Sequence, residues 1–226
     1  MRAMTGRNAK NAMKTATRDR TPGTAGRTGY ATATAATAAL ATLLLTAGCG
    51  SEASSGTVPE GWGTLKTPAV TVAHPPAFEV QGASERSKYN VAAATLEDES
   101  GTIGMITVQL DFTDADSVEE AAIGAEAGVA LGSTLGKQEE ITVSGPDGDE
   151  EARQVNFEFT QKDSGAGSGA GTPGGTLDPK AGTRVAGVIV AGLDADERTY
   201  AVRIDAVKGK LGKGDLKKII DSITVE

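Results

Sequence analysis

Apolar residues alternate with polar ones along most of the chain after residue 61, and this spacing limits the possible folds more than any other feature. A period of two puts alternate side chains on one face of an extended strand. In the stretch 104–112, Ile106, Val108, Leu110 and Phe112 share a face in this way. Seven such stretches predict β-strands, at 68–74, 90–96, 104–112, 139–143, 152–160, 184–193 and 199–207.

The apolar spacing becomes helical in two places. Ser117 and Glu120 fit a capping box, in which each side chain accepts a hydrogen bond from the other residue's backbone N–H. The small apolar residues that follow predict a helix that stops at Gly132. A second helix is predicted near the C-terminus, where the cap and the apolar stripe are Gly214, Asp215, Leu216, Ile219 and Ile220.

Turn-forming residues separate neighbouring strands at 97–101, 145–148 and 194–197. Because short turns join antiparallel neighbours, we expect an α+β fold. Its mainly antiparallel sheet should have about six to seven strands, covered by two or three helices. The run 163–183 is rich in Gly, Ser, Ala and Pro and has little to pack, so it predicts a disordered loop within one domain.

The first 48 residues have the pattern of a cleaved signal peptide. Residues 1–29 are basic and polar, residues 30–47 carry no charge, and small residues precede Cys49. The uncharged part is too short and too rich in Ala and Thr to predict a membrane-spanning helix. Translation could start at any of three methionines without changing the mature chain: Met1, Met4 or Met13.

The residues around the predicted cleavage point resemble the lipobox of bacterial lipoproteins. Ala47 and Gly48 directly precede Cys49, although Thr46 stands where the lipobox usually has Leu. The resemblance implies cleavage between Gly48 and Cys49, with a diacylglycerol on the sulfur of Cys49. Since Cys49 is the only cysteine, it cannot form an intramolecular disulfide, and acylation accounts for a thiol on a secreted chain. The alternative is an ordinary signal peptide followed by an incidental thiol.

These features predict a protein held by its lipid on the extracytoplasmic face of the cell membrane. Residues 49–60 are mostly small and polar and predict a flexible tether. Residues 61–226 are enough for a single domain with its own core. We expect this domain to be a monomer with no cofactor besides the covalent lipid.

Charge limits the partners of the mature chain. The leader holds seven Lys or Arg and one Asp, so the net charge of −8 for the whole chain becomes about −14 after cleavage. So acidic a chain repels nucleic-acid phosphates, and we expect no nucleic-acid partner. One cluster of lysines stands near the C-terminus: Lys208, Lys210, Lys213, Lys217 and Lys218. It is either a solvated face or a docking patch for an anionic partner such as an envelope polymer.

The usual catalytic and metal-binding motifs are missing from the sequence. His74 is the only histidine; it ends a predicted strand before two prolines, where we expect a half-exposed loop residue. No Gly-x-Ser-x-Gly elbow accompanies it, which argues against a catalytic triad. One histidine and one acylated cysteine cannot supply the three or four ligands of a zinc site unless carboxylates provide them all. Trp62, the only tryptophan, is interpreted as a packing residue.

Three loops carry aspartates two positions apart, and such pairs could contribute to a calcium site. None of them fits the twelve-residue calcium-binding loop with its central glycine and closing glutamate. Aspartate is common in turns because its side chain bonds nearby backbone N–H groups, so we expect solvated turns. The pairs are Asp114 and Asp116, Asp147 and Asp149, and Asp194 and Asp196.

The order of elements resembles the PsbP-like, or Mog/PsbP, α-β-α sandwich of actinobacterial surface lipoproteins. The similar features are Gly61-Trp62 before a strand that ends at Pro75-Pro76 and Phe78, the late hairpin at 199–204, and the closing helix 216–223. The resemblance implies a non-catalytic binding or assembly-assisting module, and it brings no catalytic residues. We therefore expect an accessory or binding module for an unknown envelope protein or polymer. The alternative is a cell-envelope hydrolase that uses two carboxylates.

Overall fold

The computed structural model describes residues 56–129, 132–162, 177 and 179–226. The predicted signal peptide, Cys49 with the first part of the predicted tether, and most of the glycine-rich run 163–183 lie outside the described residues. The fold described below belongs to one compact unit, Gly50–Glu226.

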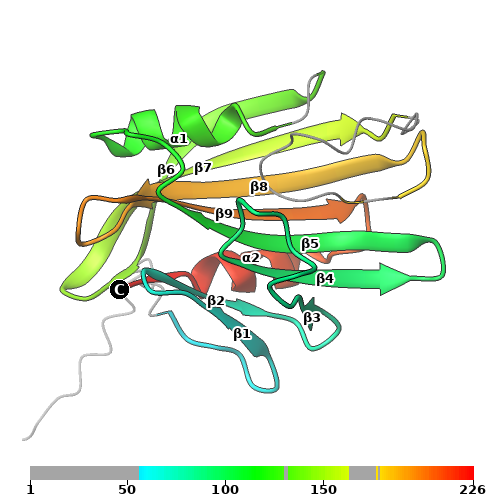
Figure 1. Cartoon of the computed structure of the whole chain (residues 1–226), viewed down its shortest axis with the longest axis horizontal. Coiled ribbons are helices and arrows are strands. Elements are labelled where there is room, and N and C mark those ends of the chain that lie inside the picture. Colours follow the sequence, from blue (N-terminus) through cyan, green and yellow to red (C-terminus); the bar gives the residue numbers. More distant parts are fainter. Residues whose placement is uncertain (1–55, 130–131, 163–176, 178) are drawn as a thin grey trace, which may run out of the picture. The chain divides into compact units, whose positions relative to one another are not determined.

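The described chain forms ten strands and two helices. The strands join in a single sheet in the order β1-β2-β10-β6-β7-β8-β9-β5-β4-β3 (Figure 1). The bounds are β1 Gly63–Lys66, β2 Val70–His74, β3 Glu79–Val80, β4 Ala92–Asp98, β5 Gly101–Leu110, α1 Val118–Glu126, β6 Thr134–Gly145, β7 Gly148–Thr160, β8 Arg184–Leu193, β9 Thr199–Val207, α2 Lys213–Asp221 and β10 Thr224–Val225.

The predicted six to seven strands are too few, because three strands of the sheet were missed. β1, β3 and β10 have four, two and two residues, which is too short for an alternating pattern to be visible. β10 exists because tertiary pairing places Thr224 between Thr71 of β2 and Ser144 of β6. The seven longer strands were predicted, and β8 and β9 have the predicted limits.

The expected antiparallel arrangement is confirmed. Every pair of neighbouring strands is antiparallel except β10 and β6, which run parallel. β1 also contacts β4, which is not its neighbour in the sheet, so the sheet curves until its first strand approaches its far end. The curvature encloses the larger hydrophobic cluster of the domain.

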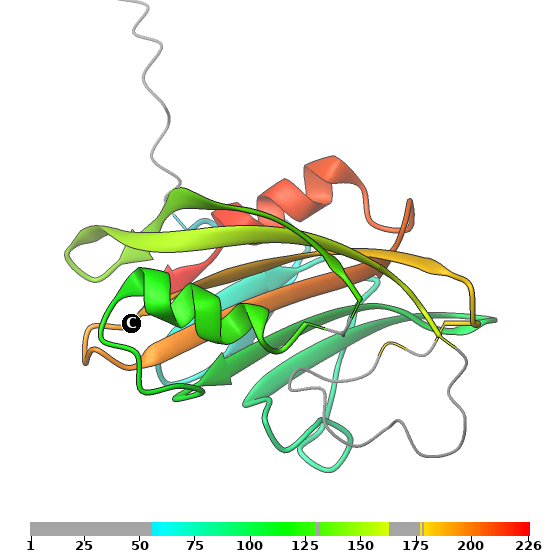
Figure 2. The ribbon, with the colours of Figure 1, turned by 90° about the horizontal axis from the view of Figure 1, so that it is seen from above.

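The central strands are buried on both faces, and their residues alternate between two clusters. Val188 and Ile204 point to the face that α2 covers, together with Ile219 of that helix. Ile189 and Ala201 point to the opposite face, where Ala122 of α1 packs on them. We call these the α2 face and the α1 face. Figure 2 shows the two helices on opposite sides of the sheet, so the layers follow the expected helix–sheet–helix order.

α1 begins as predicted and ends earlier than predicted. The Ser117 side chain accepts a hydrogen bond from the backbone N–H of Glu120 at 3.3 Å. The return bond of the capping box shifts by one residue, because the Glu120 carboxylate accepts from the N–H of Asp116. The helix is capped at Ala127 and does not reach the predicted stop at Gly132. The other helix, α2, begins earlier than predicted: its N-cap is Gly212, two residues before the predicted cap at Gly214.

Two predictions about exposure are corrected. Leu177 lies in the glycine-rich run yet is buried against Met105 and Val185, so that run does contribute a core residue. His74 was expected to be half exposed but is 5% exposed, because its ring lies over Gly63 of the paired strand β1. No helix in the described residues is long and apolar enough to cross a membrane.

Candidate functional site

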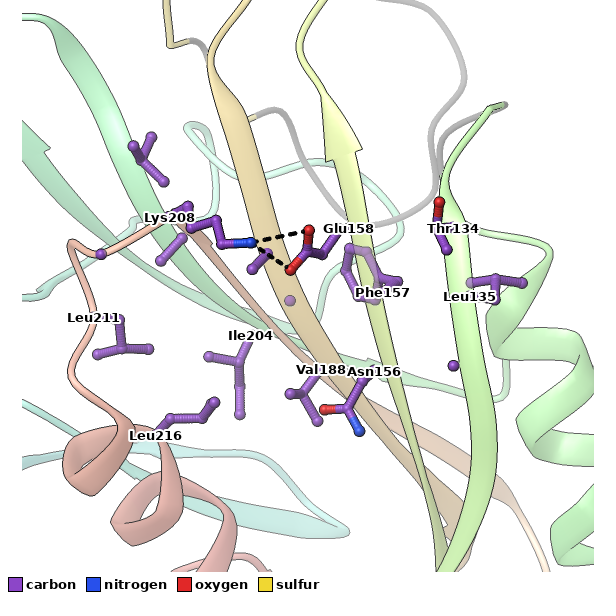
Figure 3. Close-up of a pocket in the computed structure, with 16 residues that line it drawn as sticks. Thr134, Leu135, Asn156, Phe157, Glu158, Val188, Ile204, Lys208, Leu211 and Leu216 are labelled. Atoms are coloured by element: carbon purple, nitrogen blue, oxygen red, sulfur yellow. Dashed lines mark hydrogen bonds and ion pairs between the residues drawn. The ribbon is translucent and has the colours of Figure 1, made fainter.

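A groove of about 370 Å³ opens on the α2 face, between the sheet and the segment that leads into α2. Val188 and Ile204, from β8 and β9, line its floor in Figure 3. Leu211 and Leu216 stand on the helix side, and Asn156 comes from β7 on the other side. The lining is therefore mainly aliphatic, which is the composition of surfaces that bind an apolar group.

An ion pair crosses one end of this groove. Nζ of Lys208, at the end of β9, donates to both carboxylate oxygens of Glu158 in β7, at 2.9 and 3.2 Å (Figure 3). The hydrogen bond from Lys208 lowers the pKa of Glu158, with a further contribution from the positive charge of Lys208. Glu158 is thus held ionised and is poorly suited to donate a proton as a general acid.

The predicted docking patch is not a free cationic surface. Lys208 bonds Glu158, Lys210 donates to Asp98 at 2.9 Å, and Lys217 donates to Asp221 at 2.6 Å. Lys218 lies 3.8 Å from Asp215 and also above the ring of Trp62. Lys213 is exposed at the start of α2. Carboxylates beside four of the five lysines reduce the positive potential that an anionic partner would meet.

His74 is placed for packing rather than for base catalysis. Its Nδ1 is 3.1 Å from the carbonyl oxygen of Pro75, and its buried Nε2 has no hydrogen-bond partner among the described residues.

Ser222 connects the end of α2 to β2. Its Oγ accepts from the N–H of Ala73 and donates to the carbonyl of Ile219. The hydroxyl therefore fastens the end of α2 to β2.

The aspartate pairs in loops were expected to be solvated turns, but Asp194 is only 6% exposed because its carboxylate is bonded within its own turn. One of its carboxylate oxygens accepts from the N–H groups of Asp196 and Arg198, both at 2.9 Å, and the other accepts from the Arg198 side chain. Within the described ranges, no three His, Cys, Asp or Glu side chains come close enough to hold a metal ion.

A buried polar cluster on the α1 face was missed from the sequence. Arg203 and Asp205 of β9 form an ion pair there, and Gln109 of β5 donates to Asn90 at 3.1 Å. A signal was present, because Arg203 and Asp205 stand two apart in the otherwise apolar run 201–207, which puts both charges on one buried face. Asn156 and Glu158 of the groove were also missed. They alternate with Phe157 and Phe159, and the sequence pattern identifies only the apolar face of this strand as buried.

Neither a protein-family profile nor a curated protein sequence matches the chain. Two solved structures resemble it in fold. One is a crystal structure from Bacteroides thetaiotaomicron VPI-5482, at 7% identity and a TM-score of 0.38, with 70% of this chain and 45% of that chain covered. The chain thus spans less than half of that structure. The other is Mog1p, a Ran-binding protein of Saccharomyces cerevisiae, at 15% identity and a TM-score of 0.36, with 70% and 81% covered. At these scores the similarity carries no inference about function.

Proposed function

We propose that the chain is an extracytoplasmic lipoprotein, anchored in the cell membrane through Cys49, whose domain acts by binding and without turnover. The groove on the α2 face is the binding surface. Its aliphatic floor of Val188 and Ile204 is the observation that carries the proposal, because it offers an apolar contact beside a fixed ion pair. The partner is an envelope protein or polymer that presents an apolar group.

The geometry of the groove favours binding over hydrolysis. A carboxylate-dependent hydrolase needs two carboxyl groups with different pKa values facing each other across the substrate. Glu158 is the one carboxylate among the described residues that line the groove, and its pKa is lowered rather than raised. The arrangement therefore supports the non-enzymatic alternative of the two that the sequence left open.

The proposal is tested by filling the groove. Asn156 is exposed and lines it, so Asn156→Trp should occlude the groove while leaving the core intact. Ile123→Trp is the matched control, since Ile123 is exposed on α1 at the opposite face. Immobilised chains spanning residues 50–226 would be offered solubilised envelope extract and purified envelope polymers.

We expect a component that is retained by the wild type and by Ile123→Trp and is released by Asn156→Trp. Retention that Asn156→Trp does not change would place binding elsewhere on the domain. Turnover of an envelope polysaccharide that copurifies with the chain and disappears on Glu158→Gln would establish the hydrolase instead.

A further inference from the structure

A second cavity, of about 480 Å³, lies on the α1 face, on the opposite side of the sheet from the groove. β5, β8 and β9 form its floor, the end of α1 forms one wall, and the segment before β4 forms its mouth. Ile189, Ala201 and Phe112 give it apolar surface. At the mouth, Tyr89 and Val91 are 48% and 38% exposed, which is unusual for large apolar side chains of this domain.

The cavity floor contains a guanidinium that is fixed in place and has one free edge. Arg203 is 8% exposed, and its Nε donates to both carboxylate oxygens of Asp205. Its Nη1 donates to the carbonyl of Gly128 at 2.9 Å, and the group lies 4.9 Å above the ring of Phe157. No described residue accepts a hydrogen bond from Nη2. Arg203 therefore offers a preorganised donor to whatever enters the cavity.

A matching acceptor stands beside this donor. Gln109 is 9% exposed and lines the cavity; its Nε2 donates to Asn90, and no described residue donates to its Oε1. Thr107 and Gln109 of β5 pair with Arg203 and Ala201 of β9, so Gln109 and Arg203 are diagonal neighbours on one face. Such neighbours are about 7–8 Å apart, which one small polar group can span.

Two buried polar atoms next to the cavity also have no partner in the described structure. They are Nδ2 of Asn90, which bonds Gln109 through its oxygen, and Oγ1 of Thr107, which is paired across the sheet with Arg203. Buried polar atoms are nearly always hydrogen-bonded, and exceptions ask for an explanation. Neither Asn90 nor Thr107 lines the cavity, so these atoms mark an incompletely satisfied polar cluster beside it and are not themselves ligand contacts.

The positive and negative side chains around the cavity are equal in number, and this favours an uncharged head group on the ligand. The charge of Arg203 is compensated by Asp205, and Lys88 and Asp111 at the rim carry opposite charges. A charged head group would then be buried without a counter-ion, which is strongly unfavourable. An uncharged group with one acceptor and one donor meets Nη2 of Arg203 and Oε1 of Gln109 without that penalty.

We propose that the α1-face cavity binds a small uncharged amphiphile whose head group carries both a carbonyl oxygen and an N–H or O–H, such as an amide. The head group lies between Arg203 and Gln109, and the apolar body contacts Ile189 and Phe112 and leaves past Tyr89. This site is independent of the groove proposed above, so either proposal can fail without the other.

The test uses three probes with one tail and different head groups: octanamide, octanoate and octylammonium. Each is titrated into the isotope-labelled chain 50–226, which is the whole compact unit and lacks Cys49. We expect octanamide to bind at least about tenfold more tightly than either ion, since only the amide satisfies both floor groups without burying a charge. Its resonance shifts should map to Arg203, Gln109 and the methyl groups of Ile189 and Val91.

Two variants sharpen the result. Gln109→Leu removes the acceptor and the donor to Asn90, so it should weaken octanamide binding and reduce its preference over the two ions. Asn156→Trp, which fills the groove on the other face, should leave octanamide binding unchanged. The proposal is overturned if octanoate or octylammonium binds as tightly as octanamide, if the shifts map to the groove, or if no probe binds at millimolar concentration. Because the three probes are compared on the wild type, the test holds even if Gln109→Leu does not fold.

Discussion

Arg203 and Asp205, two residues apart on β9, form an ion pair inside the α1 face: the guanidinium Nε lies 3.0 and 2.8 Å from the two carboxylate oxygens. Their side chains are 10% and 6% exposed. Burial raises the pKa of Asp205, and the charge and hydrogen bonds of Arg203 act in the opposite direction. The pair lies beside a cluster of Ile, Ala and Phe side chains on the same face.

Removing one partner of this pair should cost far more stability than replacing both. Asp205→Ala leaves the Arg203 charge buried without its counter-ion, and we expect a loss of about 3–5 kcal/mol in the free energy of unfolding. The double variant Arg203→Met/Asp205→Leu buries no charge and should recover most of that loss. Urea unfolding of residues 50–226 measures both. Equal losses for the single and double variants would contradict the assignment of a desolvated ion pair.

Gly187 should not tolerate a methyl group. A Cβ at this position in β8 would lie 2.9 Å from the carbonyl oxygen of Ile204 and closer still to Phe157 and Asp205. We expect Gly187→Ala to destabilise the domain by about 1–3 kcal/mol through overpacking. In Gly214→Ala the new methyl group meets nothing within 4 Å, and alanine favours the helix, so this control should gain about 0.4–1 kcal/mol. If Gly187→Ala leaves the free energy of unfolding unchanged, the layers of the domain are packed more loosely than described.

Asp98 should make stability depend on acid pH. The side chain and backbone N–H of Ser100, together with Lys210, donate hydrogen bonds to its carboxylate and lower its pKa from 3.8 to about 2. A carboxyl with a lowered pKa in the folded state stabilises it above the unfolded-state pKa. That contribution is lost as the pH falls from about 4 towards 2.

Thermal unfolding of Asp98→Asn tests this dependence. Its Tm should be below that of the wild type at pH 7 and should converge with it near pH 2. Asp147→Asn, in the turn between β6 and β7, serves as the comparison for loss of a carboxylate from a hairpin turn. A difference between Asp98→Asn and the wild type that stays constant from pH 7 to pH 2 would rule out a role for ionised Asp98.

The lipid anchor is tested at its attachment point. Cys49→Ala should abolish incorporation of radiolabelled palmitate and should release the chain or leave its leader uncleaved, because the sulfur is the proposed acyl acceptor. Cys49→Ser retains a small polar side chain without the sulfur and should behave in the same way. Labelling that persists in either variant would show that Cys49 is not the lipidated residue.

Much of the α+β layout could be predicted because each long strand or helix carries its own periodic pattern. β8 and β9 alternate or run apolar over nine or more residues, and turn residues separate them. The cap at Ser117 was visible because capping chemistry acts within four residues. The short strands β1, β3 and β10 were not predictable, since two to four residues hold no period and their pairing depends on distant segments.

The sequence by itself determined the mainly antiparallel sheet, the two helices and the order of the long elements, since periodicity and turn chemistry act between near neighbours in the chain. Only the tertiary structure decided which side chains meet. Glu158 and Lys208 are 50 residues apart along the chain and become partners because β7, β8 and β9 are adjacent. Arg203 is brought beside Gln109 by the pairing of β9 with β5. Strand order sets such contacts, and it is decided by the burial of whole faces rather than by any local pattern.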